Sequence, residues 1–123
     1  MSNESKIRVL QTIRQGKIGG GETHVLDLVK HLDKSVFEPI VLSFTDGPMI
    51  NRLNEMGIKN FVIPSTKAFD LIKQRKIIKL LRKEKIDIIH AHGSRAASNL
   101  IMAAKYLRLP IIYTVHGWSF HND

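Results

Sequence analysis

The chain has 123 residues, with 19 lysines and arginines against 11 acidic residues, so its formal net charge is +8. Hydrophobic residues make up 43% of the chain, which together with its length is typical of one globular domain. Cysteine is absent, which excludes disulfides and thiolate sites. No apolar run approaches the roughly 20 residues that cross a membrane, and no signal-peptide pattern precedes the first strand-like segment. We therefore expect a cytoplasmic protein.

The excess positive charge is concentrated in residues 67–85, which hold eight basic and two acidic residues. Such a block predicts an anionic partner. On a helical wheel its cations lie opposite Ile77, Leu80 and Leu81. The helix Lys73–Lys85 is then either a solvated face or a surface that docks peripherally on anionic lipid. We expect no nucleic acid partner, because no aromatic residues interleave the cations.

Short apolar runs alternate with amphipathic stretches along the chain. The runs predict strands at residues 6–13, 37–44, 59–63, 87–91 and 111–115. Apolar residues at helical spacing predict helices at residues 22–32, 48–56, 70–85 and 95–107. We expect Leu71 and Ile101 to belong to the buried stripes of the last two helices.

This alternation predicts an α/β fold: a Rossmann-like, doubly wound parallel sheet of about five strands, with helices on both faces. The expected strand order is 3-2-1-4-5. In such sheets ligands bind beyond the carboxyl ends of the strands, where the order reverses between the first and fourth strands. The turns at residues 14–22, 92–95 and 116–120 are therefore the candidate site.

The first of these turns is rich in glycine. Gly19, Gly20 and Gly21 let the backbone approach a ligand closely, and the free N–H groups of the following helix would face an anion. The spacing matches neither the dinucleotide-binding fingerprint nor a P-loop. A tight turn without a ligand is the alternative interpretation.

Histidines mark the other two turns. His90 and His92 share one side of the fourth strand, and His116 ends the fifth, so His92 and His116 are expected to lie close together. Two histidines without a carboxylate or cysteine fall short of a zinc ligand set, so we expect no metal. We interpret His90 as a buried hydrogen-bonding residue and His116 as a ligand contact.

Three segments together resemble the motifs of family 4 retaining glycosyltransferases. They are Gly-Gly-Gly-Glu at 19–22, Asp-Ile-Ile-His-Ala-His-Gly at 87–93 and Pro-Ile-Ile-Tyr-Thr-Val-His-Gly at 110–117. The resemblance implies half of a GT-B architecture. Residues 1–123 would be a truncated N-terminal, acceptor-side domain, and its partner would be the C-terminal nucleotide-sugar domain of the parent protein, which this sequence lacks.

The resemblance also implies roles for individual residues. His116 would be catalytic; Gly19, Gly20, Gly21 and Glu22 would lie against the donor diphosphate or an acceptor phosphate; and His92, Ser94 and Arg95 would face the acceptor. The reaction would be retaining transfer from a UDP- or GDP-linked sugar to a glycan or lipid acceptor in polysaccharide or glycolipid assembly, without a metal or other cofactor. The alternative hypothesis is a non-catalytic nucleotide- or phosphate-binding module that uses the same glycine turn.

Overall fold

The structure, a computed structural model, describes residues 6–14, 20–65, 67 and 69–114. Its strands are β1 (Ile7–Ile13), β2 (Phe37–Ser43), β3 (Lys59–Val62), β4 (Ile88–His92) and β5 (Ile111–Thr114). Its helices are α1 (Gly20–His31), α2 (Pro48–Glu55), the short 3-10 helix η1 (Leu71–Lys73), α3 (Gln74–Lys83) and α4 (Ser94–Leu107). Strands and helices alternate as the sequence predicts.

The five strands form one parallel sheet in the order β3-β2-β1-β4-β5. Its central strand, β1, pairs with β2 on one side and with β4 on the other. The predicted Rossmann-like topology and strand order are therefore confirmed, and the order reverses between β1 and β4. Ligands of such sheets bind beyond the carboxyl ends of the strands beside this reversal, which is the position of the candidate site.

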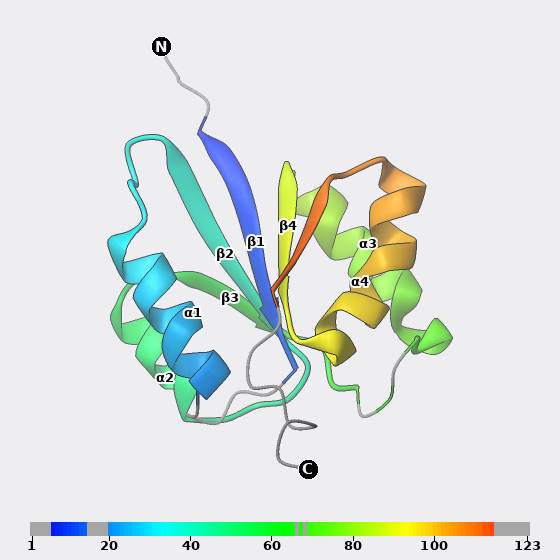
Figure 1. Cartoon of the computed structure of the whole chain (residues 1–123), viewed down its shortest axis with the longest axis horizontal. Helices are drawn as coiled ribbons and strands as arrows, with labels where there is room; N and C mark the ends of the chain where they lie inside the picture. The colour runs from blue at the N-terminus through cyan, green and yellow to red at the C-terminus, as the bar shows by residue number, and fades with distance from the viewer. Residues whose placement is uncertain (1–5, 15–19, 66, 68, 115–123) are drawn as a thin grey trace.

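Helices cover both faces of the sheet, with α1 and α2 on one face and α3 and α4 on the other (Figure 1). Successive residues of β2 divide between the two layers, because side chains of a strand alternate. Ile40 and Leu42 pack in the core under α3 and α4, whereas Val41 packs under α1 and α2. All three are fully buried, as expected for an inner strand of a sheet covered on both sides.

Two predicted core positions are wrong. Leu71 is 66% exposed, because it lies in η1 and not in α3; the helix proper begins at Gln74. Ile101 is 42% exposed, because α4 turns its small residues Ala96 and Ala103 toward the sheet. Small side chains let a helix approach a sheet closely. Because Ala96 and Ala103 face the sheet, the larger Ile101 lies on the solvent side of the helix.

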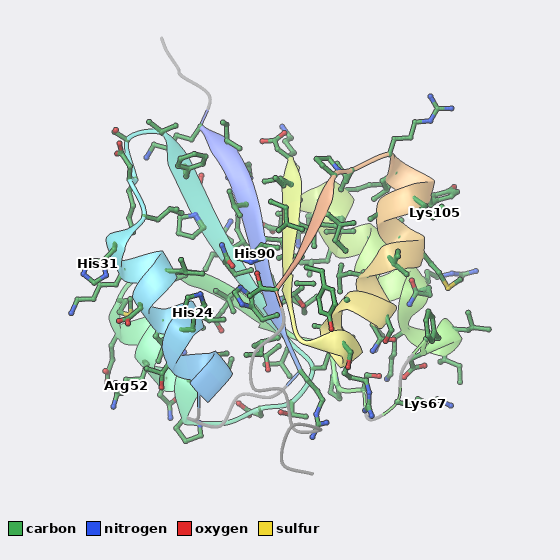
Figure 2. All side chains as sticks on the ribbon, in the orientation of Figure 1. His24, His31, Arg52, Lys67, His90 and Lys105 are labelled. Atoms are coloured by element: carbon green, nitrogen blue, oxygen red, sulfur yellow. The ribbon has the colours of Figure 1, made fainter. Side chains whose placement is uncertain are left out.

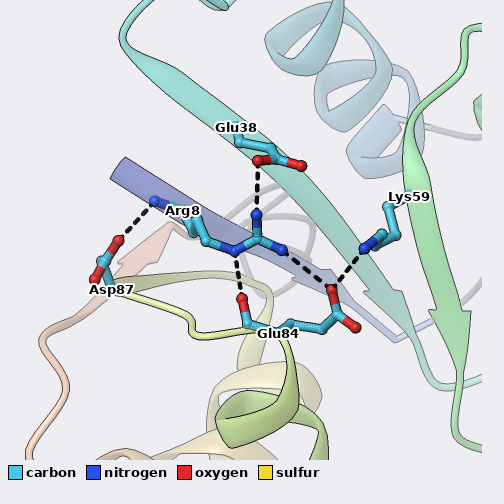
Figure 3. Close-up of polar contacts among 5 residues, drawn as sticks. All are labelled: Arg8, Glu38, Lys59, Glu84 and Asp87. Atoms are coloured by element: carbon cyan, nitrogen blue, oxygen red, sulfur yellow. Dashed lines mark hydrogen bonds and ion pairs between the residues drawn. The ribbon is translucent and has the colours of Figure 1, made fainter. Parts of the chain in front are cut away.

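An ion-pair network joins the amino ends of the strands (Figure 3). Arg8 of β1 contacts Glu38 of β2 at 2.6 Å and Glu84, after α3, at 3.1 Å, and its Nε also donates to the Glu84 main-chain carbonyl. Lys59 of β3 reaches the same Glu84 carboxylate at 3.1 Å. The Arg8 backbone N–H donates to the Asp87 carboxylate. The network ties β1, β2, β3 and the α3–β4 connection together, at the edge of the sheet opposite the candidate site.

Candidate functional site

At the carboxyl edge, β4 passes into α4 through Gly93. Its φ of 93° and ψ of 159° belong to a region that only glycine adopts readily. A Cβ built there would meet no atom within 4 Å, so the backbone conformation and not space requires glycine. The Gly93 N–H donates to the Thr114 carbonyl at 3.0 Å, which holds the turn against the end of β5. The turn therefore places Ser94 and Arg95 directly above the strand ends.

A row of hydrogen-bonded polar side chains crosses β1, β4 and β5 near this edge. His92 Nε2 donates to Gln11 Oε1 at 2.7 Å, and His90 Nε2 lies 2.6 Å from Thr114 Oγ1. The His90 and His92 ring centroids are 4.1 Å apart, which confirms that the two histidines share one side of β4. His24 of α1 approaches the His92 ring edge-on at 5.8 Å, and Figure 2 labels His24 and His90.

His92 is the more deeply buried histidine of β4, with 2% of its surface exposed, whereas His90 is half-buried. The His92 ring therefore lies inside the molecule, between β1 and α1, and its hydrogen bond holds Gln11 in place. Contact between His92 and an acceptor stays a prediction. Ser94 is exposed and Arg95 half-buried at the start of α4.

The other predicted site residues are described only in part. Gly20 and Gly21 begin α1, two residues earlier than predicted, and Glu22 lies in the same first turn. The Glu22 side chain, Gly19 and His116 lie outside the described part of the structure. The phosphate-binding and catalytic roles of these residues stay predictions, as does the expected proximity of His92 and His116.

Two hollows at the carboxyl edge share Arg95. The polar hollow, about 230 Å³, is lined by Arg14, Thr45, Ser65 and Arg95. The first three of these residues follow β1, β2 and β3, so this hollow lies over the ends of neighbouring strands. The apolar hollow, about 500 Å³, is lined by Phe69, Ser94, Arg95, Ala97, Ser98, Ile101 and Tyr113. Arg95 thus lines both a small polar hollow and a larger one whose walls are mostly apolar.

A buried hydrogen-bond network supports the region between the two hollows. Asp70, only 4% exposed, accepts a hydrogen bond from Ser65 Oγ at 2.7 Å, and its N–H donates to Asn99 Oδ1 at 2.7 Å. Asn99 Nδ2 also donates to the Lys67 carbonyl, and Gln74 Nε2 bridges the carbonyls of Asp70 and Asn99. Because Asn99 belongs to α4, the network ties the segment after β3 to that helix.

The same network stabilises the charged form of the Asp70 carboxyl group. The hydrogen bond from Ser65 lowers the pKa of Asp70, and the charges of Lys67 and Lys73 act in the same direction. Burial opposes them by raising this pKa, and the net shift is downward. Asp70 is therefore an ionised, hydrogen-bonded anchor at neutral pH.

Sequence reasoning missed this anchor and the partner of His92. Gln11 gave a usable signal, since a glutamine inside an apolar strand that is covered on both faces needs a buried hydrogen-bond partner. The sequence signal was weaker for the three network residues Asp70, Gln74 and Asn99. Each is a polar residue that turns inward, and the sequence does not show that the three would meet.

The basic face of α3 is as the sequence predicts. Ile77, Leu80 and Leu81 are buried, and the opposite side exposes five cations: Arg75, Lys76, Lys79, Arg82 and Lys83. The Arg82 guanidinium lies 5.5 Å from the ring centroid of Tyr106 on α4. Among the helices of the described residues, none has the length and apolar character needed to cross a membrane. Within the same residues, no cluster of three or more histidine, cysteine, aspartate or glutamate side chains could hold a metal ion.

Comparison with known proteins shows to which family this chain belongs. The sequence model of Glycosyltransferase Family 4 matches residues 18–123, which include all three motifs. The chain belongs to glycosyltransferase family 4. In Escherichia coli, the UDP-Gal:alpha-D-GlcNAc-diphosphoundecaprenol alpha-1,3-galactosyltransferase is 28% identical over 127 residues, which cover 98% of this chain and 33% of that protein.

Solved structures agree with the predicted half of a GT-B architecture. A glycosyltransferase from Rickettsia africae superposes with a TM-score of 0.74 at 19% identity, covering 97% of this chain and 33% of that one. HepE from Anabaena, solved with UDP and glucose, gives 0.73 at 23% identity, covering 90% and 30%. These likenesses establish the fold. This chain spans about a third of the length of each of the three relatives.

Proposed function

We propose that this chain is the N-terminal, acceptor-side part of a glycosyltransferase that moves a sugar, with retention, from a nucleotide sugar to a lipid-linked acceptor. The observation that carries the proposal is the alignment with the E. coli enzyme, which extends over 98% of this chain. The name of that enzyme specifies a nucleotide-sugar donor and a diphosphate-linked prenyl acceptor. Polysaccharide or glycolipid assembly is the kind of process that such a transfer serves.

The proposal divides the chemistry between two halves of a longer protein. The remaining length of the relatives leaves room for a second domain that would hold the nucleotide sugar, while the carboxyl edge described above faces the acceptor. The amino end of α1, with Gly20 and Gly21, offers free N–H groups to a phosphate. His116 is the proposed catalytic contact to the transferred sugar, and no metal is needed.

Sugar transfer by a complete polypeptide that carries this sequence tests the proposal. We expect label from a UDP- or GDP-linked sugar to appear on a lipid-diphosphate-linked sugar, and no turnover by the 123-residue chain alone. Stabilising the departing diphosphate requires groups fixed on both walls of the cleft. Turnover by the chain alone, at the rate of the complete protein, would contradict the division of roles. No transfer from any nucleotide sugar would contradict the function.

We also infer that the basic face of α3 holds the protein on the anionic surface where a lipid-linked acceptor resides. Each basic residue near such a surface contributes about 1 kcal/mol, so replacing two is expected to weaken vesicle binding by about 30-fold. The test is sedimentation with phosphatidylglycerol-containing vesicles, comparing Lys76→Gln/Lys79→Gln with the control Lys30→Gln/Lys34→Gln. The control pair is exposed beside α1, on the other side of the sheet. Equal loss in both variants, or binding indifferent to salt and lipid charge, would exclude this surface.

A further inference from the structure

Large apolar side chains project into solvent from the segment that leads into α3. Phe69 is 57% exposed, Leu71 66% and Ile72 77%, whereas Asp70 between them is buried. Single exposed apolar residues are ordinary on protein surfaces, but a contiguous exposed group marks a surface that contacts something apolar. We call residues 69–72 the apolar tip.

We propose that the apolar tip inserts into an anionic bilayer, at the boundary between headgroups and acyl chains, while the basic face of α3 lies on the headgroups. The inference rests on the function and the docking surface proposed above. It adds the element that enters the membrane, and it fixes which edge of the sheet faces the lipid.

Positive charge continues from the apolar tip along α3. η1 leads directly into α3, so Ile72 precedes Lys76 by four residues and Lys79 by seven. Residues at this spacing lie along one side of a helix. Within the described part of the chain, neither of these lysines forms an ion pair, and Arg75 forms none either. Their charges are therefore available to an anionic surface.

The two acidic residues near this surface are both buried and hydrogen-bonded. Asp70 accepts the hydrogen bond from Ser65, and the Glu84 side chain pairs with Arg8 and Lys59 at the amino edge. Every exposed side chain from residue 69 to residue 83 is therefore apolar or cationic. Apolar burial and attraction to anionic lipid are the two contributions that hold a protein in a membrane interface, so this composition favours an anionic bilayer.

The apolar tip has its shape before it meets a membrane. Phe69 has a φ of 50°, in the left-handed region that bulky residues rarely adopt. Such strain persists only where the surroundings enforce it. Here Asn99 of α4 enforces it from both sides, because its Oδ1 accepts from the Asp70 N–H and its Nδ2 donates to the Lys67 carbonyl. A preformed tip lowers the entropic cost of binding.

The apolar tip lies at the edge of the sheet that the acceptor must reach. Phe69 lines the apolar hollow together with Ser94 and Tyr113, which follow and end strands at the carboxyl edge. In Figure 1 the segment lies at the lower right, near the start of α4, and Figure 2 labels Lys67 beside it. Insertion of the tip brings this hollow to the level of the headgroups. A lipid-linked acceptor then reaches the carboxyl edge without leaving the bilayer.

A fluorescent label reports insertion directly, because the chain contains no cysteine to compete for it. Ile72→Cys carries the nitrobenzoxadiazole label at the tip, and Val36→Cys carries it just before β2, where the side chain is 43% exposed. We expect phosphatidylglycerol vesicles to raise the emission of the first label, and acyl-chain nitroxide lipids to quench it. The second label should respond to neither. Equal responses, or no quenching of the first label in the vesicle-bound protein, would overturn the proposal.

Sedimentation with the same vesicles measures what the tip contributes to affinity. Replacing two partly buried aliphatic side chains in Leu71→Ser/Ile72→Ser should weaken binding by about 30-fold. The binding that remains should keep its dependence on salt, since the α3 cations are unchanged. The matched control is Val36→Ser/Met56→Ser, whose side chains are exposed beside β2 and α2. Equal losses in the two pairs would overturn the proposal. The labels on the unaltered tip neighbours decide even where a serine variant does not fold.

Two other occupants of the apolar tip give different results. If a second copy of the chain covers the tip, the emission of the Ile72→Cys label rises with protein concentration in the absence of vesicles. If another part of the complete polypeptide covers it, the label responds to vesicles in the 123-residue chain but not in the complete polypeptide. Either result overturns insertion.

Insertion, docking and sugar transfer can fail independently. Salt-dependent vesicle binding without quenching of the Ile72→Cys label would overturn insertion and leave the basic face of α3 and the transfer reaction standing. Quenching of the label without sugar transfer by the complete polypeptide would support the tip and contradict the proposed function.

Discussion

Replacing Arg8 by methionine tests the network at the amino edge of the sheet. Methionine keeps the apolar stem and removes the guanidinium that contacts Glu38 and Glu84. The Glu84 side chain is 7% exposed and would retain only Lys59, which is 50% exposed, as a charged partner in the network. Breaking a buried ion pair costs about 3–5 kcal/mol, and we expect the lower end because Lys59 stays.

For a chain of this length, about 3 kcal/mol corresponds to a fall in melting temperature of about 12 °C. Thermal unfolding followed by circular dichroism measures it. The matched control is Glu38→Gln, because Glu38 is 41% exposed and exposed ion pairs contribute about 0–1 kcal/mol. The double variant Arg8→Met/Glu84→Met should be less destabilised than the two single changes added together, since no buried carboxylate is left unpaired. Equal shifts for Arg8→Met and Glu38→Gln would refute the assignment of Glu84 as the buried centre of the network.

Three further predictions concern the carboxyl edge. Gly93→Ala should cost about 1–3 kcal/mol from backbone strain alone, measured by urea unfolding, and a change below about 0.5 kcal/mol would show that the turn relaxes. Asp70→Asn should lower the melting temperature at neutral pH. The pKa of Asp70 is lowered from 3.8 in the folded protein, so its ionised carboxylate stabilises the fold above that pH. This stabilisation is lost as the pH falls through the folded-state pKa. The melting temperatures of the unaltered chain and of the variant should therefore converge only below about pH 3.8. A difference that persists unchanged into stronger acid would contradict the ionised anchor. His116→Ala in a complete polypeptide should lower turnover about a hundredfold, or about 2.7 kcal/mol, with a melting temperature within a few degrees; early unfolding with full specific activity would make His116 structural.

The alternation of apolar runs and amphipathic stretches was sufficient to predict the sheet order. Short strands separated by helices can close only a few right-handed topologies, and β1 lies at the centre in the most economical one. Helix faces were harder to predict where polar residues turn inward. Gln74 and Asn99 are buried because they hydrogen-bond to backbone carbonyls, and a hydropathy pattern does not record such partners.

The candidate site was predictable in its location but not in its supports. Arg95 lies in the first turn of α4, just after β4, so its place at the carboxyl edge follows from topology. Phe69 and Tyr113 join Arg95 around one hollow only because Asp70 and Asn99 hold the segment before η1 against α4. Contacts between residues about 30 positions apart depend on the folded geometry, and local spacing does not encode them.

The most direct test of the acceptor-side assignment is a nuclear magnetic resonance titration of the ¹⁵N-labelled 123-residue chain. One titration uses a sugar linked to a short prenyl diphosphate, and the other uses UDP-galactose at the same concentrations. Our account predicts that the lipid-linked sugar shifts the amide signals of Phe69, Ser94, Arg95 and Ser98, and that UDP-galactose shifts them far less. If UDP-galactose moves these signals and the lipid-linked sugar does not, the chain is a nucleotide-binding module and the acceptor-side assignment is wrong.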